Sequence, residues 1–218
     1  MVGDFVDFGD VDVKSKFSEK YKGNPGQKDR ISIIYPKDTA TYGAGPFVMR
    51  NTHFSDKYFV CKEGICCDKL GPSSQRFVCL IVHYKTDKKG MIIKQDGEKV
   101  PFDFKIKPWI FSSKKFTQLK GLHQEWDLKS HDLHVTCGGN EQYQDLELVP
   151  CKEALWKVKP DFMEAVYRES EPMRQTLSRE LGQDLTIDEI KELLGVGIAQ
   201  PSEAISNESD LNDILQQV

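Results

Sequence analysis

The sequence predicts a mainly β protein with C-terminal helices: an OB-fold-type barrel followed by an acidic disordered tail. Short runs rich in β-branched and aromatic residues, separated by glycine, proline and aspartate, fill residues 31–106. One helix-like segment interrupts these runs and two more strand-like runs follow it, which is the element order of an OB-type barrel. Beyond residue 159 the apolar residues recur at helical spacing, and this periodicity is lost near residue 199.

The expected strands share high β propensity and flanking turn formers. They cover residues 31–35, 47–52, 58–62, 76–84, 91–95 and 100–106, and after the helix residues 133–137 and 143–149. Asp96–Gly97 between two of these runs predicts a hairpin, because a type I′ turn needs positive φ at its central residues. Phe102, Phe104 and Ile106 alternate with charged residues, which indicates a half-buried strand with these three side chains facing the core.

The helix between the strands is expected over residues 114–120, with Ser112 or Ser113 as its cap and Gly121 at its end. Further along, Pro160 suits the first turn of a helix, and the spacing of Thr186 and Glu189 is that of a capping box. The order of these elements predicts that the chain is organised in four regions. They are an N-terminal arm (1–29), the barrel domain (30–159), a helical extension (160–198) and the acidic tail (199–218).

The net charge of −4 conceals a strong segregation of charge along the chain. Residues 1–12 hold four acids and no base, residues 13–159 hold 26 bases against 17 acids, and residues 160–218 hold 4 bases against 13 acids. A basic body between acidic ends indicates a surface that binds a polyanion. The alternative is the uneven charge that many cytosolic proteins carry.

Several classes of protein are not expected from this sequence. The longest apolar run, residues 77–82, is too short to span a membrane, and the first residues lack the pattern of a secretory signal. There is no phosphate-binding loop, serine nucleophile elbow or HExxH motif. We therefore expect no enzymatic activity, and we read the six cysteines as thiols or metal ligands rather than disulfides.

The basic body interleaves cations with aromatic residues, which is the combination that single-stranded nucleic acid requires. Cations neutralise phosphates, and aromatic faces stack on bases of any sequence. The expected phosphate contacts are Arg30, Lys37, Arg76, Lys85, Lys105, Lys107, Lys114 and Lys115. The expected stacking residues are Tyr58, Phe77, Tyr84 and Trp109, with a place in the core as the alternative for Phe77.

One histidine and three cysteines have spacings that a closed zinc site accepts. His53 precedes Cys61, and Cys66 and Cys67 follow it after a four-residue loop. The alternative is that the cysteines are partly buried free thiols, which behave as small hydrophobic residues. No required cofactor is expected, and zinc is the one metal that the pattern suggests.

A rival nucleic-acid signal lies near the C-terminus. The stretch LTIDEIKELLGV at residues 185–196 resembles the first helix and turn of a helix-turn-helix, which would make the protein a duplex-binding transcription regulator. The following residues 197–205, however, contain no lysine or arginine, and duplex phosphates would repel them. We interpret these helices as packing or partner-binding elements.

The chain resembles the helix-destabilising, single-stranded-DNA-binding proteins of tailed bacteriophages over most of residues 30–160 and again at its tail. The matching stretches are RISIIYPK (30–37), PFVMRNTH (46–53), YFVC (58–61) with CC (66–67), RFVCLIV (76–82), VPFDFKIKPW (100–109), DLHVTC (132–137) and ESDLNDIL (208–215). The resemblance implies an OB-fold cleft that binds single-stranded DNA without sequence preference during phage DNA replication, recombination and repair in the host cytoplasm. The acidic residues 1–12 do not match the basic N-terminal segment of some members.

The same resemblance assigns roles at two places in the chain. It implies a zinc loop, as in some members of the family, with His53, Cys61, Cys66 and Cys67 as the ligands. It also implies that the tail recruits phage replication and recombination proteins. The partner-binding residues expected there are Asp210, Leu211, Asp213, Ile214 and Leu215.

Overall fold

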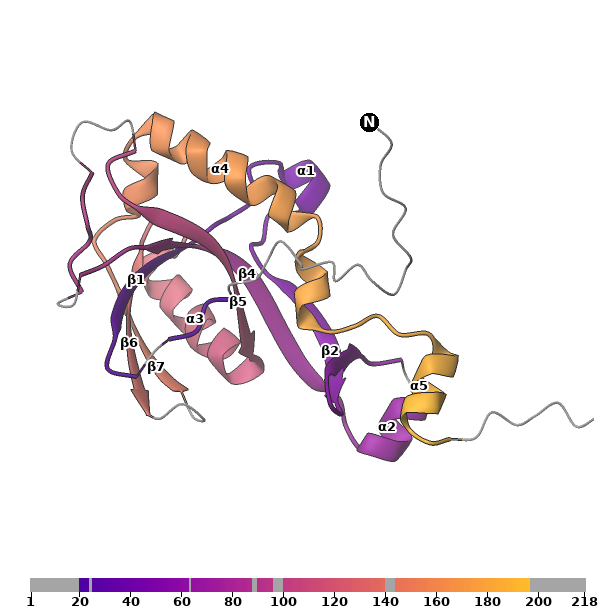
Figure 1. Ribbon diagram of the computed structural model, residues 1–218. Coiled ribbons are helices and arrows are strands. Elements are labelled where there is room, and N and C mark those ends of the chain that lie inside the picture. Colours follow the sequence, from indigo (N-terminus) through magenta and orange to yellow (C-terminus); the bar gives the residue numbers. More distant parts are fainter. Residues whose placement is uncertain are drawn as a thin grey trace, which may run out of the picture. The chain divides into compact units, whose positions relative to one another are not determined.

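The computed structural model describes residues 20–196, except residues 24, 63, 88–89, 96–99 and 140–143. Its main element is one antiparallel sheet of seven strands. The strands are labelled in Figure 1. The strands are β1 (Lys28–Ile33), β2 (Val48–Phe54), β3 (Tyr58–Val60), β4 (Ser74–Tyr84), β5 (Phe104–Ser112), β6 (Leu133–Gly139) and β7 (Gln144–Pro150). The helices are α1 (Thr39–Tyr42), α2 (Ile65–Leu70), α3 (Ser113–Trp126), α4 (Pro160–Arg174) and α5 (Ile187–Leu193), with two 3₁₀ turns, η1 (Leu155–Lys157) and η2 (Leu177–Leu181).

The strand order is β3-β2-β4-β1-β6-β7, and β5 pairs with β4 beside this path. The prediction of a mainly β protein with C-terminal helices is therefore confirmed. The expected OB-type barrel is not closed, because within the described residues β5 pairs only with β4 and β7 pairs only with β6. The number and spacing of strands in a sequence do not determine whether the outer strands meet, so this sheet stays open.

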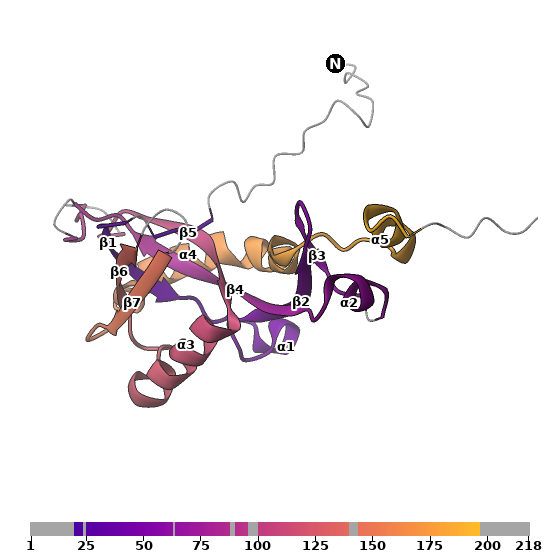
Figure 2. The same cartoon turned by 90° about the horizontal axis from the view of Figure 1, so that it is seen from below.

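Both faces of the central strand β4 are buried, which explains its unbroken apolar run. Phe77, Cys79 and Ile81 point to one face and join a core that includes Leu119 of α3. The alternate residues Val78, Leu80 and Val82 join a second core that includes residues of α4 and η2. Helices α3 and α4 accordingly lie on opposite faces of the sheet (Figures 1 and 2). Phe102, Phe104 and Ile106 pack against the second core, as their alternation predicts.

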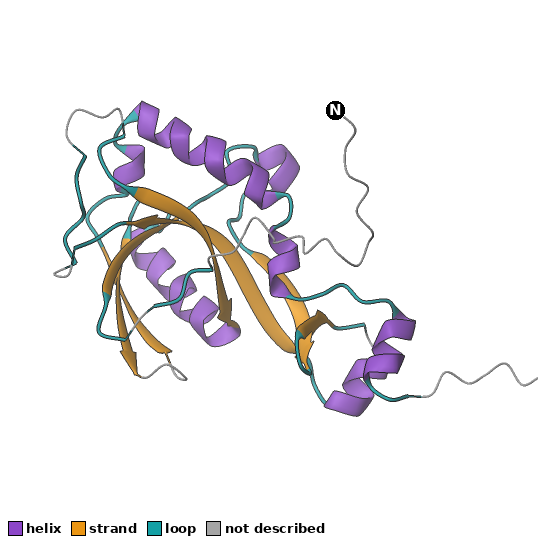
Figure 3. Ribbon diagram, in the orientation of Figure 1, coloured by secondary structure: helices purple, strands orange, loops and turns teal. Residues whose placement is uncertain are grey.

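The expected elements differ from the observed ones mainly at their ends. Gly121 does not end α3, which runs on to Trp126 because a single glycine lowers helix stability by only about 1 kcal/mol. The described residues between β4 and β5 are mostly loop with isolated bridges, among them Thr86–Ile92, in place of the strand expected at 91–95 (Figure 3). The Asp96–Gly97 turn lies outside the described residues.

Helix boundaries near the C-terminus follow the sequence signals. Helix α4 begins at Pro160, as expected. Helix α5 carries the expected capping box, in which the Thr186 hydroxyl accepts from the Glu189 amide and the Glu189 carboxylate accepts from the Thr186 amide.

Contacts divide the chain into two compact units. The first comprises residues 1–61 and 73–184, and the second comprises residues 62–72 and 185–218. Helix α4 and turn η2 therefore belong to the same unit as the sheet, and this division differs from the boundary expected at residue 159. In the second unit, α2 contacts α5. The arm before Lys20 and the tail with Asp210, Leu211, Asp213, Ile214 and Leu215 lie outside the described residues.

None of the helices that the structure describes has both the length and the apolar character needed to cross a membrane.

Candidate nucleic-acid interface and metal site

A groove of about 850 Å³ lies within the first unit, where several elements end close together. Its walls come from residues 20–23, the β2–β3 hairpin, the ends of β4 and β5, the start of α3 and the region of η2. Its charged side chains are mostly basic: Lys20, Lys22, Lys57, Arg76, Lys115 and Arg179, against Asp56 and Glu180. This groove can attract an anionic chain.

Two aromatic side chains of the β2–β3 hairpin face solvent at the groove. Phe54 and Tyr58 are paired across the hairpin, and their ring centroids lie 4.9 Å apart. Phe54 is 61% exposed and Tyr58 is 40% exposed, which is unusual for side chains of this size. Part of the surface of each ring is therefore open to an aromatic ligand.

The guanidinium of Arg76 lies over the ring of Tyr58, and both residues line the groove. The distance from the guanidinium to the ring centroid is 3.6 Å, and one terminal nitrogen donates to the Leu181 carbonyl at 3.2 Å. Burial lowers the pKa of Arg76, yet a guanidinium remains charged at every pH at which a protein is folded. The groove thus has a fixed positive charge directly beside an exposed aromatic ring.

Residues 20–23, which line the groove, are held against the sheet by hydrogen bonds of Tyr21. The Tyr21 amide donates to the Pro108 carbonyl at 2.9 Å, and its buried hydroxyl donates to Asp29 at 3.0 Å. Gly23 follows at a point where an added Cβ would lie 2.6 Å from a methyl group of Leu146, so only glycine fits without a shift. Lys20 forms an ion pair at 3.0 Å with Glu180, whose side chain is nearly buried.

Four of the residues expected to bind nucleic acid line the groove: Tyr58, Arg76, Trp109 and Lys115. Lys115 is oriented by the carbonyl of Leu146, to which its ammonium group donates at 2.7 Å, and burial lowers its pKa. Trp109 is only 2% exposed, so it forms part of the groove wall and presents no free face for stacking.

The prediction that Phe77 and Tyr84 stack on bases is wrong, because both are core residues. The Phe77 ring is stacked on Phe116 with centroids 4.2 Å apart. Tyr84 is fully buried, and its hydroxyl donates to Asp132 at 3.3 Å while accepting from the Trp156 amide at 3.1 Å. A base could not reach either ring in the folded protein.

The other expected phosphate contacts do not line the groove. Arg30 is committed to an ion pair with buried Asp132 at 2.8 Å, and Lys85 pairs with Asp103 at 2.8 Å. Lys37 lies near the Tyr167 ring. Lys105 and Lys107 are on β5 and Lys114 is on α3.

The sequence interpretation also missed groove residues, because the elements that supply them are far apart in the chain. These residues include Lys20, Lys22, Phe54, Lys57 and Arg179. One local signal could have identified part of the site. Phe54 and Tyr58 flank the short polar segment Ser55–Lys57, which is typical of a hairpin whose tip presents aromatic residues.

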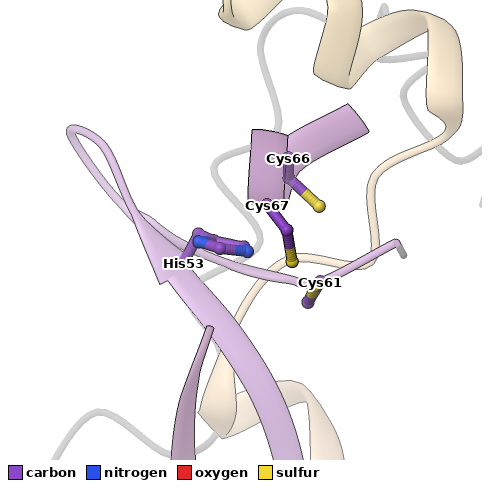
Figure 4. Close-up of side chains that lie close together, drawn as sticks. All are labelled: His53, Cys61, Cys66 and Cys67. Atoms are coloured by element: carbon purple, nitrogen blue, oxygen red, sulfur yellow. The ribbon is translucent and has the colours of Figure 1, made fainter. Parts of the chain in front are cut away.

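The expected metal ligands do come together. The nitrogen of His53 and the sulfur atoms of Cys61, Cys66 and Cys67 all lie within 4.8 Å of one another. Figure 4 shows the imidazole from β2 and the three sulfur atoms facing a common space. Burial lowers the pKa of His53, which favours the neutral imidazole that a metal requires.

Helix α2 explains how adjacent cysteines can serve one site. It begins after Gly64, whose φ of 97° lies in the left-handed region that favours glycine. Neighbouring residues in an α-helix are about 100° apart around its axis, so two consecutive side chains can reach toward the same point. Cys66 and Cys67 occupy the first turn of this helix, and the His/Cys cluster could hold a metal ion.

Comparison with models of known protein families and with curated proteins gives no match for this chain.

Proposed function

We propose that this protein binds single-stranded DNA without sequence preference and protects it during phage DNA replication, recombination and repair, without catalysing a reaction. The observation that carries the proposal is the groove of the first unit, in which six basic side chains surround the exposed rings of Phe54 and Tyr58. Basic side chains neutralise phosphates and aromatic faces stack on bases, and together they bind a single strand whatever its sequence.

The chemistry of the groove favours a single strand over a duplex. An exposed aromatic ring binds a base only when the face of that base is free, and bases within a duplex are already stacked on their neighbours. Among the described residues, a hairpin, a 3₁₀ turn and the first turn of α3 line the groove, and none of these elements has the arrangement of a recognition helix placed in a major groove.

The pairing of the strands supports an OB-type arrangement. Strand β1 pairs with β4 and β6, β4 continues to β5, and β6 continues to β7. Helix α3 lies between β5 and β6 in the chain, where an OB-fold has its helix. OB-folds are partly open barrels that bind oligonucleotides, so an open sheet with this order is compatible with the proposed ligand.

The test is a titration of the full chain with oligo-dT, RNA of equal length and duplex DNA at two salt concentrations, followed by fluorescence anisotropy. We expect oligo-dT to bind well ahead of duplex. Because each neutralised phosphate contributes about 0.7 to the slope of log K against log salt on single strands, a groove with six cations should give a slope of about −4. Equal affinity for duplex, or no dependence on salt, would contradict the proposal and favour a duplex regulator that uses residues 185–196.

We further propose that His53, Cys61, Cys66 and Cys67 hold zinc. One neutral imidazole and three thiolates form a common closed zinc site, and zinc–sulfur bonds of about 2.3 Å place tetrahedral ligands about 3.8 Å apart. The observed spread of 4.8 Å is close to that distance. A closed site of this type has no open position for a substrate, so its role would be to stabilise the loop between β3 and α2.

Protein purified without chelator should contain about one equivalent of zinc by elemental analysis, and chelation should lower its melting temperature. Cys67→Ser should lose the metal, whereas the matched variant Cys151→Ser should retain it because Cys151 lies outside the His/Cys cluster. Less than about a tenth of an equivalent in the unaltered protein would favour free thiols, which pack as small hydrophobic residues.

The proposal includes a role for residues 199–218 as a recruiting segment for phage replication and recombination proteins. The support is the sequence alone, in which four carboxylates precede or separate Leu211, Ile214 and Leu215. Acidic segments with apolar residues suit a partner that offers an apolar pocket with a basic rim.

A further inference from the structure

The described chain begins in the wall of the groove. Lys20, Tyr21, Lys22 and Gly23 all line it, and Tyr21 is fastened to the sheet through its amide and its hydroxyl. The preceding residues are therefore attached at the groove itself.

Residues 1–12 carry the chemistry that the groove selects. They contain Asp4, Asp7 and Asp10 at intervals of three, with Phe5 and Phe8 directly after the first two, and Asp12 follows. No base occurs among these residues. Carboxylates that alternate with aromatic rings resemble a single strand of DNA, in which anionic phosphates alternate with aromatic bases. The groove offers six basic side chains and two exposed rings to either ligand.

The connecting segment is long enough to bring these residues back over the groove. Seven residues separate Asp12 from Lys20. The eight Cα–Cα steps from Asp12 to Lys20 reach at most about 28 Å when extended. A short tether of this kind gives an effective concentration of the order of millimolar, which is sufficient for a weak ionic contact to be populated.

We propose that residues 1–12 of this chain occupy the groove in the free protein and that single-stranded DNA must displace them. The inference rests on the proposed function for its DNA-dependent part, while the occupation of the groove can be observed without DNA. Its physical consequence is a threshold: a long strand with many phosphates displaces the segment, whereas a short or isolated anion competes with it poorly.

The test compares two full-length variants with equal changes of charge. The first replaces the four aspartates of residues 1–12 by asparagine: Asp4→Asn, Asp7→Asn, Asp10→Asn and Asp12→Asn. The matched control neutralises four exposed carboxylates that do not line the groove: Glu125→Gln, Glu164→Gln, Glu169→Gln and Glu192→Gln. Both variants change the net charge of the protein by the same amount, so a general electrostatic effect would act on both alike.

In low salt, the first variant should bind oligo-dT about 3–10-fold more tightly than the unaltered protein, and its salt dependence should be steeper. At 0.5 M salt the difference should fall below about twofold, because screening weakens the contact that has been removed. The control variant should differ from the unaltered protein by less than about twofold. An equal gain in both variants, or no gain in the first, would overturn the proposal.

A second measurement uses no DNA. Backbone amide NMR spectra of the ¹⁵N-labelled full chain and of the first variant should differ at groove residues, above all at residues 20–23 and 54–58. The control variant should leave these signals in place. If the groove signals shift while oligo-dT does not bind any variant, occupation by residues 1–12 stands and the proposed function fails. If oligo-dT binds but the groove signals stay unchanged in the first variant, the proposed function stands and the occupation is wrong.

Discussion

Replacing Arg30 by alanine should lower the free energy of unfolding by about 3–5 kcal/mol, because it leaves a buried carboxylate without its partner. Arg30 Nε lies 2.8 Å from Asp132 Oδ2, and Asp132 is fully buried. Burial raises the pKa of Asp132, and the nearby guanidinium is the main influence that opposes this shift. The measurement is urea denaturation monitored by tryptophan fluorescence.

Lys37→Ala is the matched control for Arg30→Ala. Lys37 is exposed, and the ring of Tyr167 lies 5.8 Å from its ammonium group, so its loss should change stability by less than about 0.5 kcal/mol. Folded Arg30→Ala protein should retain its affinity for oligo-dT. A stable Arg30→Ala protein with much weaker DNA binding would instead restore Arg30 to the phosphate contacts that the sequence suggests.

Replacing both Phe54 and Tyr58 by alanine should produce the largest loss of DNA affinity available from side-chain truncation. Each stacked base contributes about 1–3 kcal/mol, which corresponds to about 5–150-fold in affinity for each ring that stacks on a base. The double variant should remain folded because neither ring belongs to either hydrophobic core. Oligo-dT titration together with thermal unfolding measures the two quantities separately.

Two other aromatic substitutions serve as controls for the hairpin variant. Trp126 is 45% exposed on α3 but does not line the groove, so Trp126→Ala should leave affinity unchanged. Phe77→Ala should cost about 3–5 kcal/mol of stability, since Phe77 is a core residue, with no specific effect on the DNA contact. If Trp126→Ala weakens binding as much as the hairpin variant does, stacking at the hairpin is not the source of affinity.

Much of the fold could be predicted because local signals agree with the tertiary structure. The alternation of Phe104 and Ile106 with lysines matches a strand that packs one face on the second core, and Pro160 begins its helix where the sequence places it. Closure of the barrel could not be predicted, since it depends on whether β5 and β7 meet across the sheet. Gly121 shows the same limitation, because packing of Leu119 and neighbouring residues stabilises α3 beyond it.

The metal ligands could be predicted and most of the groove could not, for a common reason. The four ligands lie within fifteen residues of one another, so their spacing alone indicates that they can meet. The groove instead combines residues near positions 20, 57, 76, 115 and 179, which only the tertiary structure brings together. The prediction that Phe77 and Tyr84 stack on bases depended on neighbouring cations, which occur both on a nucleic-acid surface and at the ends of a buried strand.

Strand β4 forms hydrogen bonds with three neighbours, and both of its faces are covered. Its central amides should therefore exchange with solvent deuterium only when the whole unit unfolds. Arg76 belongs to this strand, so the charge beside the Tyr58 ring is carried by an element that is paired on both edges. A ligand that meets a rigid cation loses little free energy in ordering it, and the association is accordingly more favourable for the same number of contacts.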